Sequence, residues 1–283
     1  MDSKATNPLS KHFRQPAIYF KLPSNGQFYA EGALEMPPNG ELAVYPMTTK
    51  DEITIRTPDS LINGNCIVEV LQSCVPAIKN AWEVPSMDVD AALIAIRIAS
   101  YGHEMDIKVN CPHCNHENEF TVDLRSILDK MQIPNFSDVV KIDNLKYKLK
   151  PQNYRTTNRI NMLRFEEQKM VNQLLDNTEE DQTKKLDIFR KKMQDLIDLN
   201  LDVLAECTEY VQLDDNTIVN DKNHIREYYG QCDKKITKEL SDYFRDKNEK
   251  VINNLVQAVC SNCSSSFSTS LDFDYSNFFG KGF

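Results

Sequence analysis

The sequence lacks long hydrophobic runs and an excess of basic residues. Its longest apolar stretch, residues 91–99, is interrupted by Arg97 and is far too short to span a bilayer. Residues 1–16 carry charges but no apolar segment, so we expect no secretory signal. With 33 Lys and Arg against 42 Asp and Glu, the net charge of −9 argues against nucleic-acid binding through bulk charge.

Motifs of common enzyme classes are also missing. The sequence contains no glycine-rich phosphate loop, no metalloprotease helix and no serine nucleophile elbow. The charged residues between positions 155 and 255 are typical of solvated helix faces, so we assign no catalytic carboxylates there. We therefore expect a protein with no enzymatic activity, no catalytic residue and no organic cofactor.

What the chain does contain is eight cysteines among 283 residues of ordinary globular composition, 41% apolar and 27% charged. Because we expect no secretory signal, the eight cysteines favour thiols and metal ligands over a disulfide framework. Neither Cys66 nor Cys74 has a CxxC partner. We interpret both as buried apolar thiols.

Four other cysteines form two CxxC pairs, Cys111 with Cys114 and Cys260 with Cys263, separated by 145 residues. A two-residue spacer lets both sulfurs of a turn point at one tetrahedral ion about 2.3 Å away. Residues typical of β-strands flank both pairs: Ile107, Val109, Phe120, Val122, Val256, Val259 and Phe267. The pattern predicts a split four-cysteine zinc ribbon that binds one structural Zn²⁺. The alternative is four reduced cysteines without a ligand.

Two other interpretations of the first pair stay open. His113 and His116 are close enough to compete as ligands, although four sulfurs suffice without them. Cys-Pro-His-Cys is also the active-site sequence of some thioredoxin-like disulfide oxidoreductases. Such an enzyme needs an amphipathic helix directly after the motif, whereas residues 115–124 predict a turn and then a strand.

The remaining pattern predicts an α+β fold. Residues 18–22 and 42–45 are typical of strands, and residues 48–52 begin a short helix; this stretch is either a surface β-region or a partner-docking arm. Ser86 is expected to cap a buried helix that ends at Gly102. Hairpins are expected at residues 139–149 and 209–219, with an antiparallel helix pair between them.

The predicted organisation has four segments. They are an extended or β N-terminal arm (1–55), a helical core with the first cysteine pair and a hairpin (56–150), a mainly helical module inserted between the zinc half-sites (151–255), and the second pair with an aromatic tail (256–283). The tail contains Phe273, Tyr275, Phe278, Phe279 and Phe283. It either covers the ribbon or docks in a neighbouring protein, and we expect removal of residues 278–283 to weaken assembly while leaving the fold intact.

Several blocks resemble a known family by their order and spacing. They are residues 22–29 (Leu-Pro-Ser-Asn-Gly-Gln-Phe-Tyr), residues 46–52 (Pro-Met-Thr-Thr-Lys-Asp-Glu), the helix at 91–104 and the Cys-Pro-His-Cys motif. Together they resemble the baseplate hub subunit family of T-even-like, contractile-tailed (Myoviridae-type) bacteriophages, most clearly over residues 18–125.

The resemblance implies a virion or assembly protein of the tail baseplate, present in the host cytoplasm during assembly. It implies contacts with other baseplate or hub proteins, in one or several copies, without membrane insertion or direct nucleic-acid binding. Members differ in whether they stay in the finished tail. The alternative is a zinc-ribbon adaptor of a nucleic-acid machine, for which the sequence near the cysteine pairs offers only Lys108 and Arg125 as basic residues.

Overall fold

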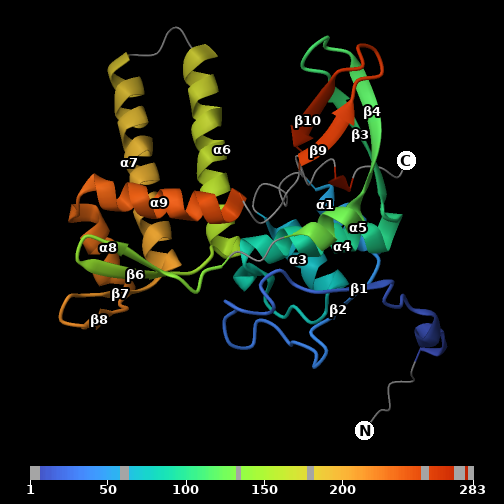
Figure 1. Ribbon diagram of the computed structural model, residues 1–283, viewed down its shortest axis with the longest axis horizontal. Helices are drawn as coiled ribbons and strands as arrows, with labels where there is room; N and C mark the ends of the chain where they lie inside the picture. Colours follow the sequence, from blue (N-terminus) through green and yellow to red (C-terminus); the bar gives the residue numbers. More distant parts are fainter. Residues whose placement is uncertain are drawn as a thin grey trace.

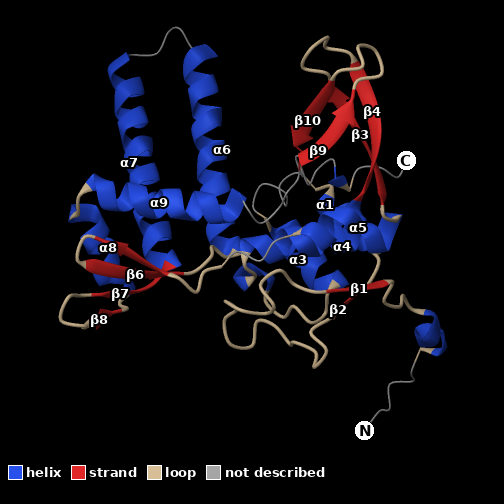
Figure 2. Cartoon of the chain, in the orientation of Figure 1, coloured by secondary structure: helices blue, strands red, loops and turns tan. Residues whose placement is uncertain are grey.

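The computed structural model describes residues 7–57, 64–131, 135–176, 182–249, 255–270 and 278–279. Within these ranges, helices combine with four small antiparallel sheets, which confirms the α+β class (Figure 1). Buried apolar side chains gather in three clusters: a first core around helix α4, a second core beside a four-stranded sheet, and a small cluster in the ribbon. Figure 2 shows the ribbon strands and the four-stranded sheet on opposite sides of the helical centre.

Helix α4 (Ser86–Tyr101) is the centre of the first core, and eleven of its sixteen residues are buried. Helix α3 (Asn65–Cys74) packs beside it and also contributes Cys66 and Cys74 to this core. The predicted cap was wrong by one residue. Pro85 occupies the cap position without a side-chain bond, and the Ser86 N–H donates to the Gln152 carbonyl at 2.9 Å. Gly102 ends the helix as predicted, at a φ of +87°.

The N-terminal residues cover the first core. Strands β1 (Ile18–Phe20) and β2 (Leu42–Val44) pair antiparallel, and each buries one face in this core. Helix α1 (Thr49–Ile55) follows, with Thr48 as its cap in a reciprocal pair with Asp51. These strands confirm the predicted β-type runs. The boundary at residue 55 stays a prediction, but the chain on both sides of it contributes to one core.

Both predicted hairpins are confirmed, and the structure joins them. Strands β5 (Val139–Ile142) and β6 (Leu145–Leu149) form the first, while β7 (Thr208–Gln212) and β8 (Ile218–Val219) form the second. Pairing of β6 with β7 makes one sheet in the order β5-β6-β7-β8. Helices α8 (Lys222–Gln231) and α9 (Lys234–Glu249) contribute to the second core beside this sheet.

The longest helices, α6 (Tyr154–Asp176) and α7 (Gln182–Cys207), stand side by side and run in opposite directions, with α9 crossing near their base (Figure 1). Ion pairs join Arg159 to Glu206 at 2.8 Å and Lys192 to Glu166 at 3.2 Å. The first pair joins the start of α6 to the end of α7, and the second joins the middles of the two helices, which confirms the predicted antiparallel pair.

The ribbon is formed by β3 (Glu104–Asn110), β4 (Glu117–Asp123), β9 (Leu255–Val259) and β10 (Ser266–Ser270). Helix α5 (Leu124–Lys130) returns the chain to the first core. Two short 3₁₀ helices, η1 (Pro8–His12) and η2 (Ala81–Glu83), complete the described elements. No helix in the described ranges is long and apolar enough to cross a membrane.

The aromatic tail corrects an expectation. Phe278 and Phe279 are 3% and 2% exposed and belong to the first core. These two rings therefore neither cover the ribbon cluster nor remain available to dock in a neighbouring protein. They meet edge to face with ring centroids 5.1 Å apart. Because core aromatics contribute strongly to folding, their removal is now expected to destabilise the isolated chain. Phe273, Tyr275 and Phe283 lie outside the described residues.

Candidate metal centre

The two cysteine turns have nearly the same backbone geometry. In the first, the Cys111 N–H donates to the His116 carbonyl and the Asn115 N–H donates back to the Cys111 carbonyl, both at 2.9 Å. The second repeats these bonds between Cys260 and residues 264–265, at 2.9 and 3.0 Å. Each turn also places one residue in the left-handed region, Asn115 and Ser264, both at a φ of +56°. Two equivalent turns therefore present their sulfurs from opposite hairpins.

The structure brings together the four predicted ligands. The sulfurs of Cys111, Cys114, Cys260 and Cys263 all lie within 4.8 Å of one another. Cys111 and Cys263 are 3.7 Å apart, and Cys114 and Cys260 are 3.6 Å apart. A tetrahedral ion with Zn–S bonds of about 2.3 Å separates its sulfurs by about 3.8 Å, whereas a disulfide separates them by about 2.05 Å. The cluster therefore has the dimensions of a metal site and could hold one ion.

His113 and His116 are both exposed, and the grouping of close metal-ligating atoms found among the described residues contains only the four sulfurs. A set of four protein ligands fills every position of a tetrahedral ion. No position remains for a substrate or an activated water, so such a site is structural in type.

The thiols of the cluster experience different electrostatic surroundings. The backbone N–H of Cys263 lies toward the sulfur of Cys260 and lowers the pKa of that thiol to about 6. Burial raises the pKa of the Cys111 thiol to about 11. A bound dication removes this difference, because metal binding displaces the thiol protons.

Two asparagines connect the turns, and the sequence analysis did not single them out. The buried Asn118 on β4 donates to the His116 carbonyl at 2.9 Å and to the sulfur of Cys260 at 3.6 Å. Its carbonyl oxygen accepts from the N–H of Ser261 at 2.8 Å. Asn262 donates in the opposite direction, to the sulfur of Cys114 at 3.7 Å. Hydrogen bonds of this kind orient ligands and stabilise thiolates around structural metals.

The oxidoreductase alternative does not fit this geometry. The first cysteine pair is followed by a turn and strand β4 rather than by a helix. The second pair lies directly against it, which a redox site of that type does not require. Cys66 and Cys74 are fully buried, as predicted, and burial raises the pKa of their thiols to about 11 and about 12.

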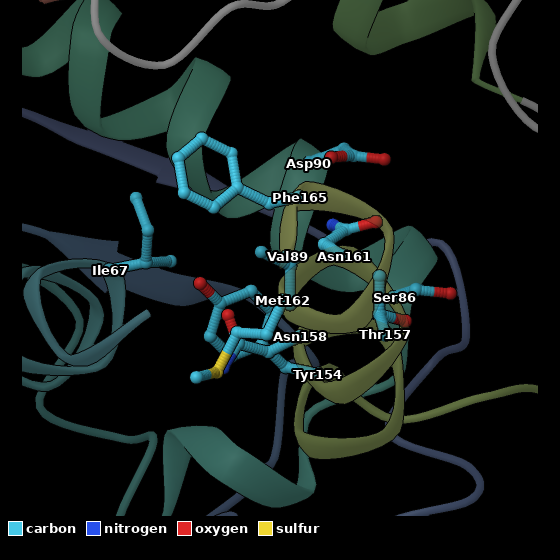
Figure 3. Close-up of a pocket in the computed structure, with 10 residues that line it drawn as sticks. All are labelled: Ile67, Ser86, Val89, Asp90, Tyr154, Thr157, Asn158, Asn161, Met162 and Phe165. Carbon is cyan, nitrogen blue, oxygen red and sulfur yellow. The ribbon is translucent and has the colours of Figure 1, made fainter. Parts of the chain in front are cut away.

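A separate hollow of about 340 Å³ lies between α3, α4 and α6, where Ile67, Met162 and Phe165 point toward the same space (Figure 3). Asp90 is the one carboxylate among its described lining residues, which include neither cysteine nor histidine. Asp90 and Tyr154 are the titratable side chains of this described lining.

The fold and the cluster define a class of protein first. An α+β chain in which four cysteines from two distant hairpins form a closed cluster has the arrangement of a structural metal site. The particular family follows from sequence comparison. The model of the T4 bacteriophage base plate protein family matches residues 16–280, and the chain belongs to that family. No curated protein and no solved structure matches the chain.

Proposed function

We propose that this protein is a structural or assembly component of the hub in a contractile phage tail baseplate. The match to the base plate protein family over residues 16–280 is the observation that carries the proposal. The protein acts through contacts with other baseplate or hub proteins and catalyses no reaction. It works in the tail baseplate of the virion and is assembled in the host cytoplasm.

The four-cysteine cluster binds one structural Zn²⁺ in this proposal. Its support is the sulfur spacing of 3.6–3.7 Å between opposite turns, which matches the edge of a zinc–thiolate tetrahedron. The ion ties the hairpin that follows α4 to the hairpin that follows α9. It thereby fixes both ends of the intervening helical module and preserves the surfaces that bind partners.

The direct test uses a phage in which this gene is inactivated and supplied again from a plasmid. We expect complete baseplates in electron micrographs only when the wild-type protein is supplied. Normal baseplates without the protein would overturn the proposal. Mass spectrometry of purified tails then separates the two roles, because a structural component stays in the tail whereas an assembly factor is absent from it.

A further inference from the structure

A groove of about 850 Å³ is lined mainly by residues of α6, α7 and α9. Figure 1 shows these three helices beside one another. Its apolar floor includes Ile160, Leu201, Leu204 and Phe244. Amide and hydroxyl side chains lie among these residues: Gln152, Thr157, Asn161, Asn200, Thr237 and Ser241. We call this feature the α6–α9 groove.

The charge of the α6–α9 groove is opposite to that of the whole chain. Arg164, Lys234 and Arg245 line it, and its fifteen described lining residues include no Asp or Glu. The chain as a whole carries 42 acidic and 33 basic residues. A groove with positive charge alone is therefore a local departure from the overall balance, and it favours an anionic ligand.

Two of these cations have no partner in the described structure. Arg245 pairs with Asp242 at 2.6 Å, but the exposed side chains of Arg164 and Lys234 form no ion pair or hydrogen bond there. Other cations of these helices behave differently, since Arg159 on α6 and Lys192 on α7 both pair with carboxylates across the α6–α7 pair. Arg164 and Lys234 are thus available to carboxylates from outside the chain.

The apolar part of the groove is also incompletely covered. Ile197 on α7 is 50% exposed, and Ile160 and Leu201 are only half-buried. Docking of an apolar side chain here would remove these surfaces from water, which is favourable. A matching ligand combines carboxylates with apolar side chains.

We propose that the α6–α9 groove binds an acidic amphipathic segment of another baseplate protein. Carboxylates of that segment pair with Arg164 and Lys234, and its apolar side chains cover Ile197 and Leu201. The choice of a baseplate protein rests on the proposed function. Nucleic acid fits less well, because the one aromatic ring in the lining, Phe244, is 8% exposed and offers no stacking surface.

The test places a photo-crosslinking amino acid at Ile197 in the full chain during phage infection. We expect crosslinks to a segment of another tail protein in which Asp or Glu flank apolar residues. Arg164→Glu together with Lys234→Glu should lower the crosslink yield at least tenfold. The matched control is Lys141→Glu, an exposed lysine on β5 outside the groove, which should leave the yield unchanged.

The charge-reversed variants are expected to fold. Lys234 is the first residue of α9, where a glutamate interacts favourably with the helix dipole, so Lys234→Glu does not weaken the helix. Circular dichroism and metal content should match those of the wild-type protein. Loss of crosslinking in a folded variant then reports the groove itself.

Several results would overturn the inference: an unchanged yield in the double variant, no crosslink at all, or crosslinks to nucleic acid or to a second copy of this chain. These results are distinguishable from failure of the proposed function. Baseplates that form normally without the protein contradict the function, whereas a baseplate that needs the protein but tolerates the double variant contradicts only the groove.

Discussion

The first core and the ribbon hold their shape by different means. Among the residues whose burial the structure describes, the first core contains 29 buried apolar residues and the ribbon cluster contains four, of which two are Cys111 and Cys260. Ala258 and Phe267 are the other two, with Val109 and Phe120 packed against them. So small a core cannot offset the entropy of ordering two hairpins. Burial therefore differs sharply between the two regions, and we expect the ribbon to depend on its four sulfurs where the core around α4 does not.

The largest expected effect comes from removing one ligand. Cys260→Ser should abolish tight metal binding, which contributes about 10–16 kcal/mol in zinc-finger peptides. In hydrogen exchange we expect amides of β9 and β10 to lose their protection, while amides of α4 keep theirs. Cys232→Ser is the matched control, since Cys232 is half-buried and lies outside the cluster. If β9 and β10 kept their protection in Cys260→Ser, the ribbon would not depend on its sulfurs and the difference from the first core would not hold.

The ribbon could be predicted because its chemistry is local in sequence. Two CxxC pairs with β-type flanks specify the two turns. Because one ion needs four sulfur ligands, the two pairs must lie close together in the fold. The pairing of β6 with β7 could not be predicted in the same way, because it joins strands separated by the whole α6–α7 pair. The bridging role of Asn118 was missed for the same reason, since its partner Ser261 is 143 residues away.

The predicted cap at Ser86 and the predicted role of the tail failed for physical reasons. Pro85 already occupies the cap position, at φ −54° and ψ 138°, so the helix starts one residue earlier than a cap at Ser86 implies. Phe278 and Phe279 follow a segment without helical periodicity, and the sequence alone does not show that they pack in the first core. Whether an aromatic residue outside a regular helix or strand is buried depends on tertiary packing, which the local sequence does not specify.

A second prediction concerns the first core directly. Phe279→Ala should lower the free energy of unfolding by about 3–5 kcal/mol, because it leaves a cavity among tightly packed side chains. Phe13→Ala is the control: Phe13 is 57% exposed, and its loss should change stability by less than about 0.5 kcal/mol. Urea unfolding measures both. Equal stabilities for the two variants would show that the tail does not belong to this core.

A third prediction uses a buried carboxylate of the same core. Asp88 on α4 accepts bonds from the backbone N–H and hydroxyl of Ser24 and, at 2.8 Å, from the hydroxyl of Tyr29. Burial raises the pKa of Asp88 to about 6, although these bonds oppose the shift. The folded protein therefore binds a proton that the unfolded chain has released between pH 4 and 6. The contribution of this proton to the free energy of unfolding is fully present below about pH 4 and is lost as the pH rises through about 6.

Asp88→Asn should remove that pH dependence. The difference in unfolding free energy between wild type and variant should change by roughly 2–3 kcal/mol from pH 4 to pH 7. Urea titrations at several pH values measure it, and both proteins keep the four cysteines, so metal loss at low pH affects them alike. A constant difference across this range would contradict the assignment.

The smallest effect is expected at the ribbon's bridging amide. Asn118→Ala leaves all four sulfurs in place but removes the bonds to Cys260 and Ser261. We expect zinc affinity to fall about 10–100-fold, as is usual for groups that orient metal ligands. Competition with a chelator measures the affinity. Thr121→Ala, at an exposed position of the same strand, is the control. Equal zinc affinities in the two variants would show that the hydrogen bonds of Asn118 do not contribute to metal binding.

The most direct measurement of the central claim is zinc X-ray absorption spectroscopy on the purified, reduced protein, together with its metal content. The account predicts one zinc per chain with four sulfur neighbours at about 2.3 Å. A ribbon that is folded in metal-free protein, or a first shell in which nitrogen replaces sulfur, would contradict it.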